Sequence, residues 1–439
     1  MGEKTGLHAG YAKMDITPDY QVGLGGYSNA ETRRNTEGVA ERIYATCIAF
    51  TDGDETILVY TIDNCSCGRA FADEIREAVK NAVGIDGEKV FCAATHSHSC
   101  PGLGGHPEAQ QYRELLLNAC VEGAKKALAD RAPAVPMAAK KHFPGMNSTR
   151  HVELANGVFA GYNWRKQNSP IVGPGGFADN QMVLVKFARE EKKDILLINW
   201  QGHPDCTGQI GMHVIAPSFV GPLRDTLAVG SGMEVAYFTG ADGNMIIDCA
   251  KFFPELAHNM NWRRYGVQIG TLALDTLDEL VEVEGTGIAT ARAIVEVDVD
   301  HSWDHMVPQA DEVYALWKST DKPTGDVLAR KYNMSSVYHA RAIRSKAAME
   351  KTKELEINAF RVGGIGFTTG TYEMFSESGI QVKGRSPYEY TMILTGNSSY
   401  IPSAHAHDHR CYEADTGFYA KGTAEKLVDK YVELLNAIQ

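Results

Sequence analysis

The sequence predicts an α/β protein with a mixed β-sheet core flanked by helices. Short apolar segments with the length and composition of strands alternate with amphipathic helical segments along the whole chain. Two pairs of apolar segments are separated only by short charged turns, which is typical of hairpins. Histidines follow directly after two of the segments, and ligands of α/β proteins bind at strand ends.

The first predicted strands lie close to the start of the chain. Residues 9–16 form an apolar segment that ends before Pro18. Residues 42–50 and 55–63 are joined by the turn TDGD, so we expect a hairpin or adjacent strands. Residues 89–94, KVFCAA, form the next strand.

Helices are predicted where apolar residues recur at helical spacing. Residues 71–84 show this spacing and end in Gly84, a residue typical of helix C-termini. Residues 111–131 form the clearest helix in the first half of the chain. Further helical segments are 217–229, 262–280, 311–320, 336–354 and 421–438.

In the second half, residues 181–188 and 194–200 are predicted to pair around the charged turn REEKKD. Residues 234–239 form a strand that runs into a Gly-rich turn. Residues 287–300 alternate between apolar and polar side chains, as a half-buried strand does. Residues 357–370 and 388–397 are each expected to form one further strand.

Composition is that of an ordinary globular protein, with 44% hydrophobic and 22% charged residues among 439. The formal net charge is −12 and no basic patch stands out, so nucleic acid is not an expected partner. There is no internal repeat, low-complexity segment or convincing linker, and we therefore expect residues 1–439 to form a single domain. The sequence does not indicate an oligomeric state.

The nine cysteines are odd in number and their spacing suggests no disulfide framework, which favours a reducing compartment. No apolar stretch reaches 18 residues, and the first residues show no export signal. We therefore expect a cytoplasmic protein without a membrane span, although a chain trimmed of a signal peptide would begin in the same way.

The most informative motif is THSHSCPG, residues 95–102, directly after the strand at 89–94. In a strand, His96 and His98 would point to the same side, because side chains alternate with period two. Neutral imidazole is the commonest protein ligand for zinc. An isolated His-x-His is more often a pair of polar loop residues, so the rest of the chain has to support the assignment.

Three other places combine a strand end with a side chain that can bind a metal. His203 follows the strand at 194–200 and lies between Gly202 and Pro204. Glu373 and Tyr400 follow the segments at 357–370 and 388–397. Taken singly, each has a plainer structural explanation, and motif matches often mislead. Together, two imidazoles, a carboxylate and a phenolic oxygen are donors suited to Zn²⁺ with room left for water.

These motifs resemble, in order and spacing, the catalytic domain of neutral/alkaline (non-lysosomal) ceramidases. The similarity covers AGYAKMDITP and the Gly-rich loop that follows it, ERIYATCIAFTDGDETILVYTIDN, THSHSCPG, NWQGHP, YEMF, and YIPS with CYEADTGFYAKGTAEKLVD. It extends from one end of the chain to the other. The resemblance implies a ceramidase-like fold and a zinc-dependent hydrolase of carbon–nitrogen (amide) bonds.

By this resemblance His96, His203, Glu373 and Tyr400 correspond to the ligands of one zinc ion per chain. His98 corresponds to the second histidine beside the metal, where it would act as general base or orient the attacking water. Tyr400 would also help to stabilise the oxyanion. Arg150, in GMNSTR, loosely matches an arginine that borders the active site.

The chain departs from the family where true ceramidases carry a required serine. In FTGADGNMIID, Asn244 stands for the motif's aspartate and Ile246 for its serine. The family's C-terminal β-sandwich, which needs about 100 residues, is not expected here. The substrate is therefore expected to be a small, N-acylated molecule other than ceramide. The alternatives are a catalytically silent zinc- or ligand-binding homologue and a metallohydrolase of an ester or another bond.

Two further groups could bind metal. His405, His407 and His409 recur at period two, which fits a second site or, more simply, a solvated loop near the mouth of the site. A mixed Cys/His site could use cysteines close to the histidines, namely Cys65, Cys67, Cys100 and Cys206. A plainer role for them is packing at strand ends. Asp63, after a strand, could orient a histidine ligand.

Overall fold

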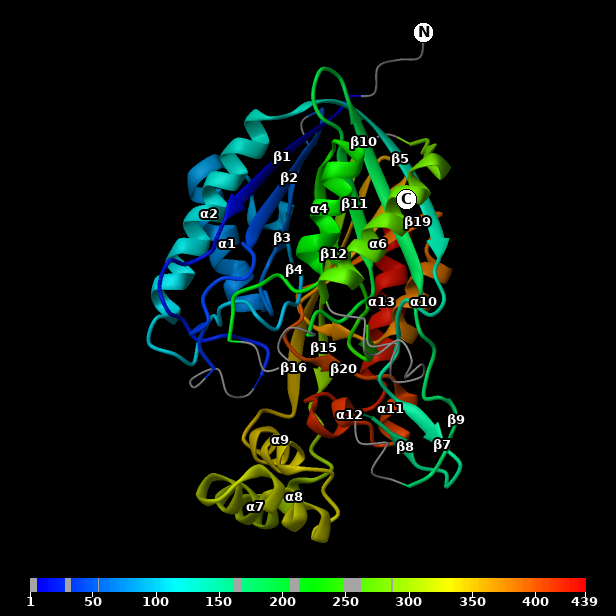
Figure 1. Ribbon diagram of the computed structural model, residues 1–439. Helices are drawn as coiled ribbons and strands as arrows, with labels where there is room; N and C mark the ends of the chain where they lie inside the picture. Colours follow the sequence, from blue (N-terminus) through cyan, green and yellow to red (C-terminus); the bar gives the residue numbers. More distant parts are fainter. Residues whose placement is uncertain are drawn as a thin grey trace.

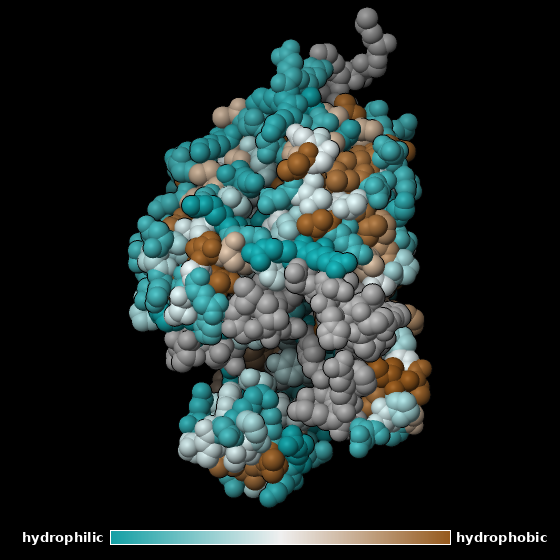
Figure 2. Space-filling model, in the orientation of Figure 1, coloured by the Kyte–Doolittle hydropathy of each residue, from teal (hydrophilic) through white to brown (hydrophobic). Residues whose placement is uncertain are grey.

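The computed structural model describes most of the chain. The described residues are 6–27, 33–53, 55–161, 168–205, 213–247, 262–285 and 287–439. Cys206, one of the candidate thiol ligands, lies outside these residues. Within them, none of the helices is both long enough and apolar enough to cross a bilayer. The face shown in Figure 2 is mainly hydrophilic, with hydrophobic residues in separate small groups.

The larger sheet in the described part of the chain has nine strands in the order β12-β11-β10-β5-β1-β2-β3-β4, with β14 pairing to β5. Its strands are β1 (Leu7–Asp15), β2 (Tyr44–Asp52), β3 (Glu55–Ile62), β4 (Val90–Ala94), β5 (Ala132–His142), β10 (Gln181–Arg189), β11 (Ile195–Trp200), β12 (Glu234–Thr239) and β14 (Val281–Glu282). The two predicted hairpins, β2–β3 and β10–β11, are antiparallel, whereas β3–β4 and β11–β12 are parallel. The predicted mixed sheet is therefore confirmed.

A second sheet has the order β15-β16-β17-β19. Its strands are β15 (Ile288–Asp298), β16 (Thr352–Val362), β17 (Ile365–Gly370) and β19 (Tyr390–Thr395). The predictions were wrong in two places here. Residues 357–370 form two strands, because the chain reverses at Gly363, whose φ of +59° suits glycine. The predicted helix at 336–354 ends at Ala347, since residues from Thr352 pair with β15 instead.

The two sheets face each other across a shared core, and helices cover their outer faces (Figure 1). Alternate residues of one strand show this: Ile48 and Phe50 belong to the core between the sheets, whereas Cys47 and Ala49 pack toward the helices. The helices are α1 (Arg69–Val83), α2 (Ala109–Ala129), α4 (Val220–Ser231), α6 (Trp262–Thr276), α7 (Val307–Ser319), α8 (Lys322–Lys331), α9 (Val337–Ala347), α10 (Ser376–Arg385), α11 (Ala404–Asp408), α12 (Tyr412–Thr416) and α13 (Thr423–Ala437). α7, α8 and α9 form a separate small lobe at the bottom of Figure 1.

The larger sheet is strongly curved. β1 pairs with β5 at only two positions, His8 with Pro133 and Ala9 with Ala132. Because of this bend, the edge strand β12 lies against β3, a strand of the other half of the sheet. The hydroxyl of Thr61 in β3 donates a hydrogen bond to the carbonyl oxygen of Tyr237 in β12, 2.6 Å away. The curvature brings loops from both halves of the sheet together.

Short strand pairs complete the surroundings of these loops. β18 (Glu373–Met374) pairs in parallel with β20 (Tyr400–Ile401), and β13 (Met245–Ile246) pairs with β6 (Ser148–Thr149). A small three-stranded sheet is formed by β7 (Val152–Leu154), β8 (Phe159–Ala160) and β9 (Ile171–Pro174). After β19, the described residues form β20, α11, α12 and α13, and no β-sandwich follows among them, in agreement with the prediction.

Candidate metal centre

His96 and His98 lie in the loop that follows β4, and their rings meet. The expectation that both belong to a strand was wrong, because β4 ends at Ala94 and His96 has a φ of +65°. Non-glycine residues rarely adopt this left-handed conformation, which is found disproportionately at functional sites. The turn brings His98 Nε2 within 3.2 Å of His96 Nε2, with the ring planes almost perpendicular.

His203 reaches the same place from the loop after β11. Its ring centroid lies 4.5 Å from that of His96 and 5.0 Å from that of His98. The backbone N–H of His98 donates a hydrogen bond to the carbonyl oxygen of Pro204, 3.1 Å away, and this bond ties the two loops together.

Glu373 in β18 closes the group, with its Oε2 3.5 Å from His96 Nε2. One possible ligand atom each of His96, His203 and Glu373 lies within 4.8 Å of the other two. All four side chains are buried, with exposed fractions of 2% for His96, 7% for His98, 1% for His203 and 7% for Glu373.

Hydrogen bonds to backbone carbonyl groups orient two of the imidazoles. Nδ1 of His96 donates to the carbonyl oxygen of Cys65, 2.5 Å away, and Nδ1 of His203 to that of Asp242, 3.2 Å away. Because a neutral imidazole has one N–H, these bonds leave Nε2 as the atom that can bind a metal whenever the ring is neutral.

Tyr400 lies beside Glu373, since the two residues are directly opposite each other in the β18–β20 pair. Burial, and next the carboxylate of Glu373, raise the pKa of Tyr400, so its phenol keeps its proton. The structure therefore places Tyr400 next to the three-residue group that it was predicted to complete.

Arg150 is buried at the side of the centre. Its Nη2 donates to the carbonyl oxygen of Gly243 and lies 3.5 Å from His203 Nδ1. Its Nε forms an ion pair with Glu413 in α12 at 3.1 Å, and its guanidinium lies 5.7 Å from the centroid of the Tyr400 ring. The role of Glu413 was not predicted, because the sequence around a carboxylate in a helix does not indicate an ion-pair partner far away in the chain.

Burial controls the ionisation of the three histidines differently. Burial, with the nearby His96 and Arg150, lowers the pKa of His203 to about 4. Burial and the same kind of repulsion hold the pKa of His98 well below its usual value. For His96, burial lowers the pKa, but Glu373 and Cys65 outweigh it and the pKa is well above the usual value. Two of the three imidazoles are thus held in the neutral form that binds metals or accepts protons.

The donor set fits a divalent metal. Oε2 of Glu373 is buried and has no hydrogen-bond partner within the described residues, and the same is true of His98 Nδ1. Buried polar atoms of this kind normally have a partner, which an ion or water can supply. Imidazole and carboxylate donors are the ligands of catalytic zinc sites.

The cysteines and Asp63 differ in how they lie relative to the centre. Cys65 Sγ lies 3.8 Å from His96 Nδ1, and Cys65, His96 and His98 form a second group of possible ligands. Cys67 and Cys100 are buried core residues. The suggestion that Asp63 orients a histidine was wrong, because its carboxylate forms a bidentate pair with Arg224 at 2.6 and 3.0 Å.

The three later histidines lie in or after α11, and two of them, His405 and His409, pack on the small sheet rather than on the centre. The rings of His405 and His409 contact that of Phe159 at centroid distances of 5.4 and 4.8 Å. His407 is half-buried on another side of α11 and is not grouped with them. Among the described residues these histidines are not part of a group of three or more convergent metal ligands.

Ile246 is buried in β13, where it pairs with Ser148. Asn244 has a structural role, since its side chain accepts a hydrogen bond from the backbone N–H of Ser376 and donates one to Glu377, both 2.9 Å long. The two residues that depart from the ceramidase motif are thus integrated into the packing around the centre.

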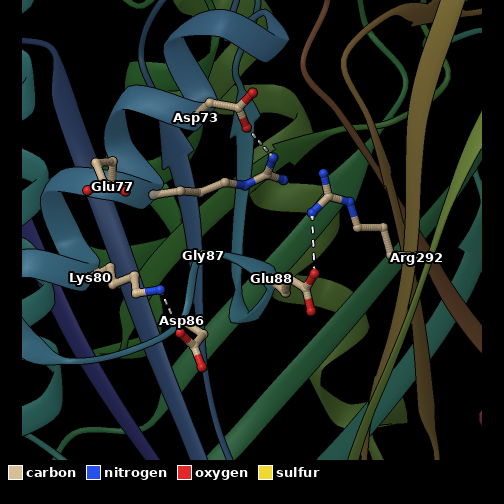
Figure 3. Close-up of a pocket in the computed structure, with 8 residues that line it drawn as sticks. Asp73, Glu77, Lys80, Asp86, Gly87, Glu88 and Arg292 are labelled. Carbon is tan, nitrogen blue, oxygen red and sulfur yellow. Dashed lines mark hydrogen bonds and ion pairs between the residues drawn. The ribbon is translucent and has the colours of Figure 1, made fainter.

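A separate pocket of about 510 Å³ lies between α1 and β15 (Figure 3). Its cations are paired: Arg76 with Asp73 at 2.8 Å, Lys80 with Asp86 at 3.1 Å, and Arg292 with Glu88 at 3.9 Å. The residues that line it are Asp73, Arg76, Glu77, Lys80, Asp86, Gly87, Glu88 and Arg292. None of them belongs to the candidate centre, and the pocket is a solvated network of ion pairs.

The fold and the site together define an α/β protein with convergent side chains that could bind a metal, where the curved sheet brings its loops together. No family model matches the sequence, and no curated protein sequence matches it. Solved structures do match. The chain is similar to a neutral ceramidase from Pseudomonas aeruginosa, with a TM-score of 0.73 and 16% identity over 99% of this chain and 75% of that one. A ceramidase complexed with C2 gives a TM-score of 0.69 and 15% identity over the same shares. The predicted ceramidase-like fold is thus confirmed.

Proposed function

We propose that this protein is a zinc-dependent hydrolase that cleaves an amide bond by the attack of water on a carbonyl group. The observation that carries the proposal is the convergence of His96, His203 and Glu373, buried and with ligand atoms within 4.8 Å of one another, in a ceramidase-like fold. Residues 1–439 act in this proposal as a single catalytic domain.

One zinc ion per chain would be held by His96, His203, Glu373 and Tyr400. When bound, zinc lowers the pKa of water toward neutrality and polarises a substrate carbonyl. The other roles in the reaction belong to side chains of the protein.

His98 is the proposed general base. Its pKa is held low by burial, so the ring is neutral, and its Nδ1 has no hydrogen-bond partner within the described residues. A neutral imidazole at this position can take the proton of the attacking water and later give it to the leaving amine.

Tyr400 and Arg150 are proposed to act on the carbonyl side of the substrate. The protonated phenol of Tyr400 can donate a hydrogen bond to the oxyanion that forms during attack. Arg150 borders the site and holds the loop that carries Gly243, and its charge is shared with Glu413. We assign Arg150 to orientation of the substrate.

The proposed substrate is a small N-acylated molecule other than ceramide. Ile246 occupies the place of the serine that the resemblance assigns to true ceramidases, and its apolar side chain cannot supply a hydroxyl.

The seven described cysteines are free thiols, which supports a reducing compartment such as the cytoplasm.

The alternative is a silent homologue that holds zinc or another ligand without turnover, and Ile246 is the observation that favours it. A closed site without room for water would be expected in that case, because structural zinc sites are fully coordinated by protein. A third candidate, hydrolysis of an ester, uses the same carbonyl chemistry.

Elemental analysis of the purified protein and of a His96→Ala/His203→Ala double variant tests the proposal. We expect about one zinc per chain in the wild type and none in the variant. A panel of N-acyl amides and matched esters then separates the hydrolases from the silent homologue. A wild type without stoichiometric metal after zinc is supplied would refute the hydrolase assignment.

A further inference from the structure

Asp242 is a buried carboxylate beside the centre to which the roles above assign nothing. It lies in the turn after β12 and is 0% exposed, and neither of its carboxylate oxygens has a hydrogen-bond partner within the described residues. Its Oδ2 lies 3.4 Å from His203 Nδ1, and its own carbonyl oxygen lies 3.2 Å from the same nitrogen. The backbone carbonyl oxygen of Asp242 therefore accepts the N–H of the imidazole, and the carboxylate lies beside it at ion-pair distance.

The negative charges around Asp242 favour the binding of a cation. A buried carboxylate is costly unless a positive charge or several hydrogen bonds balance it. Arg150 lies nearby, but its guanidinium also pairs with the buried carboxylate of Glu413. Glu373, on the other side of the histidines, is likewise buried. The centre thus holds two carboxylates for which a divalent ion supplies the matching charge.

We propose that Asp242 is the positioning residue of His203: its backbone carbonyl oxygen accepts the Nδ1–H so that Nε2 is presented to the metal, and its carboxylate, 3.4 Å from the same nitrogen, balances the second charge of the ion. This inference rests on the proposed zinc site. A carbonyl oxygen that accepts the outer N–H of a metal-bound histidine fixes the tautomer, and a carboxylate beside that N–H raises the basicity of the ligand.

The first test is the zinc affinity of Asp242→Asn, measured by competition with a chromogenic chelator. The amide keeps the shape of the side chain but removes its charge, and we expect an affinity about 10- to 100-fold weaker than that of the wild type. Asp179→Asn is the matched control, because Asp179 is also buried but pairs with Lys383 at 2.6 Å. We expect Asp179→Asn to lower the stability of the fold and to leave zinc affinity unchanged.

Thermal unfolding gives a second readout. Without metal, Asp242→Asn is expected to unfold at the same temperature as the wild type or higher, because the variant lacks an uncompensated buried carboxylate. With zinc, its gain in Tm is expected to be smaller. Nitrogen NMR of the zinc-loaded wild type is a third readout that needs no variant, and His203 is expected to carry its proton on Nδ1.

Four outcomes would overturn the inference. They are wild-type zinc affinity in Asp242→Asn, an equal loss of affinity in Asp179→Asn, a metal-free Asp242→Asn clearly less stable than the metal-free wild type, and a proton on Nε2 of His203. The experiments distinguish failure of this inference from failure of the proposed function. A wild type that binds no zinc overturns both proposals, whereas a wild type that binds zinc no more tightly than Asp242→Asn overturns only this one.

Discussion

The hydroxyl of Thr239 donates a hydrogen bond to the carbonyl oxygen of Thr95, 2.8 Å away, although Thr239 ends the strand at one edge of the larger sheet and Thr95 follows the strand at the other edge. Thr95 directly precedes His96. The hydroxyl of Thr395, at the end of β19 in the second sheet, donates in turn to the carbonyl oxygen of Thr239, 3.1 Å away. Threonine hydroxyl groups therefore join the edges of both sheets directly beneath the candidate centre.

Replacing Thr239 with Val tests whether this bond stabilises the curvature of the sheet. Valine keeps the shape of the side chain but leaves the buried carbonyl group of Thr95 without the hydroxyl. We expect the free energy of unfolding to fall by about 1–3 kcal/mol, measured by urea denaturation. Thr56→Val is the control, since Thr56 bonds to Thr51 in a partly exposed hairpin position. Equal losses in the two variants would contradict the special role of Thr239.

The curvature also explains how much of the site could be predicted from sequence. His96, His203, Glu373 and Tyr400 could each be found because a metal-competent side chain follows an apolar strand-like segment, and their order matches a known family. Their convergence could not be derived, since it depends on the bend at β1 and β5, where only two residue pairs connect the halves of the sheet.

The supporting residues were not predictable in the same way. The hydrogen-bond partner of His96 is the backbone carbonyl group of Cys65. Every residue has such a group, so the sequence does not indicate which one a histidine will contact. Asp63 was favoured as an orienting carboxylate because it ends a strand, but Arg224, distant in sequence, pairs with it. The second sheet was missed because a Gly-Gly turn within residues 357–370 divides what was taken for one strand.

Gly26 and Tyr27 pack directly on His98. Gly26 has a φ of +90°, and a Cβ added there would lie 2.5 Å from His98 Cγ. We expect Gly26→Ala to destabilise the fold and to lower the rate of hydrolysis, because the His98 ring has to move.

Gly38→Ala separates the two effects of this substitution. Gly38 has a φ of +87°, but a Cβ there would meet nothing within 4 Å. Both variants should lose about 1–2 kcal/mol of stability through the left-handed backbone. Only Gly26→Ala should also lose kcat/KM toward the amide identified in the substrate panel. Equal activity in both variants would show that His98 does not need its present position.

Zinc is expected to stabilise the folded protein, since the ion binds the centre in the folded state. At a free zinc concentration about 100-fold above Kd, the free energy of unfolding should rise by about 2.7 kcal/mol. His203→Ala should abolish this gain. His142→Ala should retain it, because His142 is exposed and bonds to Asn180 instead. Calorimetry with and without a chelator measures the effect, and a chelator that leaves the wild-type Tm unchanged would contradict it.

Glu413 should make stability depend on acid pH. The carboxylate is fully buried between Arg150 Nε at 3.1 Å and His151 Nε2 at 2.8 Å. Burial raises its pKa, but His151 and Arg150 lower it more strongly, and the folded-state pKa is about 2, compared with 4.5 for an unperturbed glutamate. A depressed carboxyl pKa contributes stability above the unfolded-state pKa, and this stability is lost as the pH falls from 4.5 toward 2.

The difference in pKa corresponds to stability on the order of 3 kcal/mol. Glu413→Gln cannot titrate, so its free energy of unfolding should be lower than that of the wild type at neutral pH and should fall less steeply between about pH 5 and pH 3. Glu433→Gln is the control, because Glu433 is 65% exposed and pairs with Lys430 at the surface. Urea denaturation at each pH gives the three curves. Since protonation of Glu413 would also release Arg150 from its partner, the loss of stability and the loss of activity should occur over the same pH range in the wild type. Parallel stability curves for Glu413→Gln and the wild type would show that the buried pair does not cause this pH dependence.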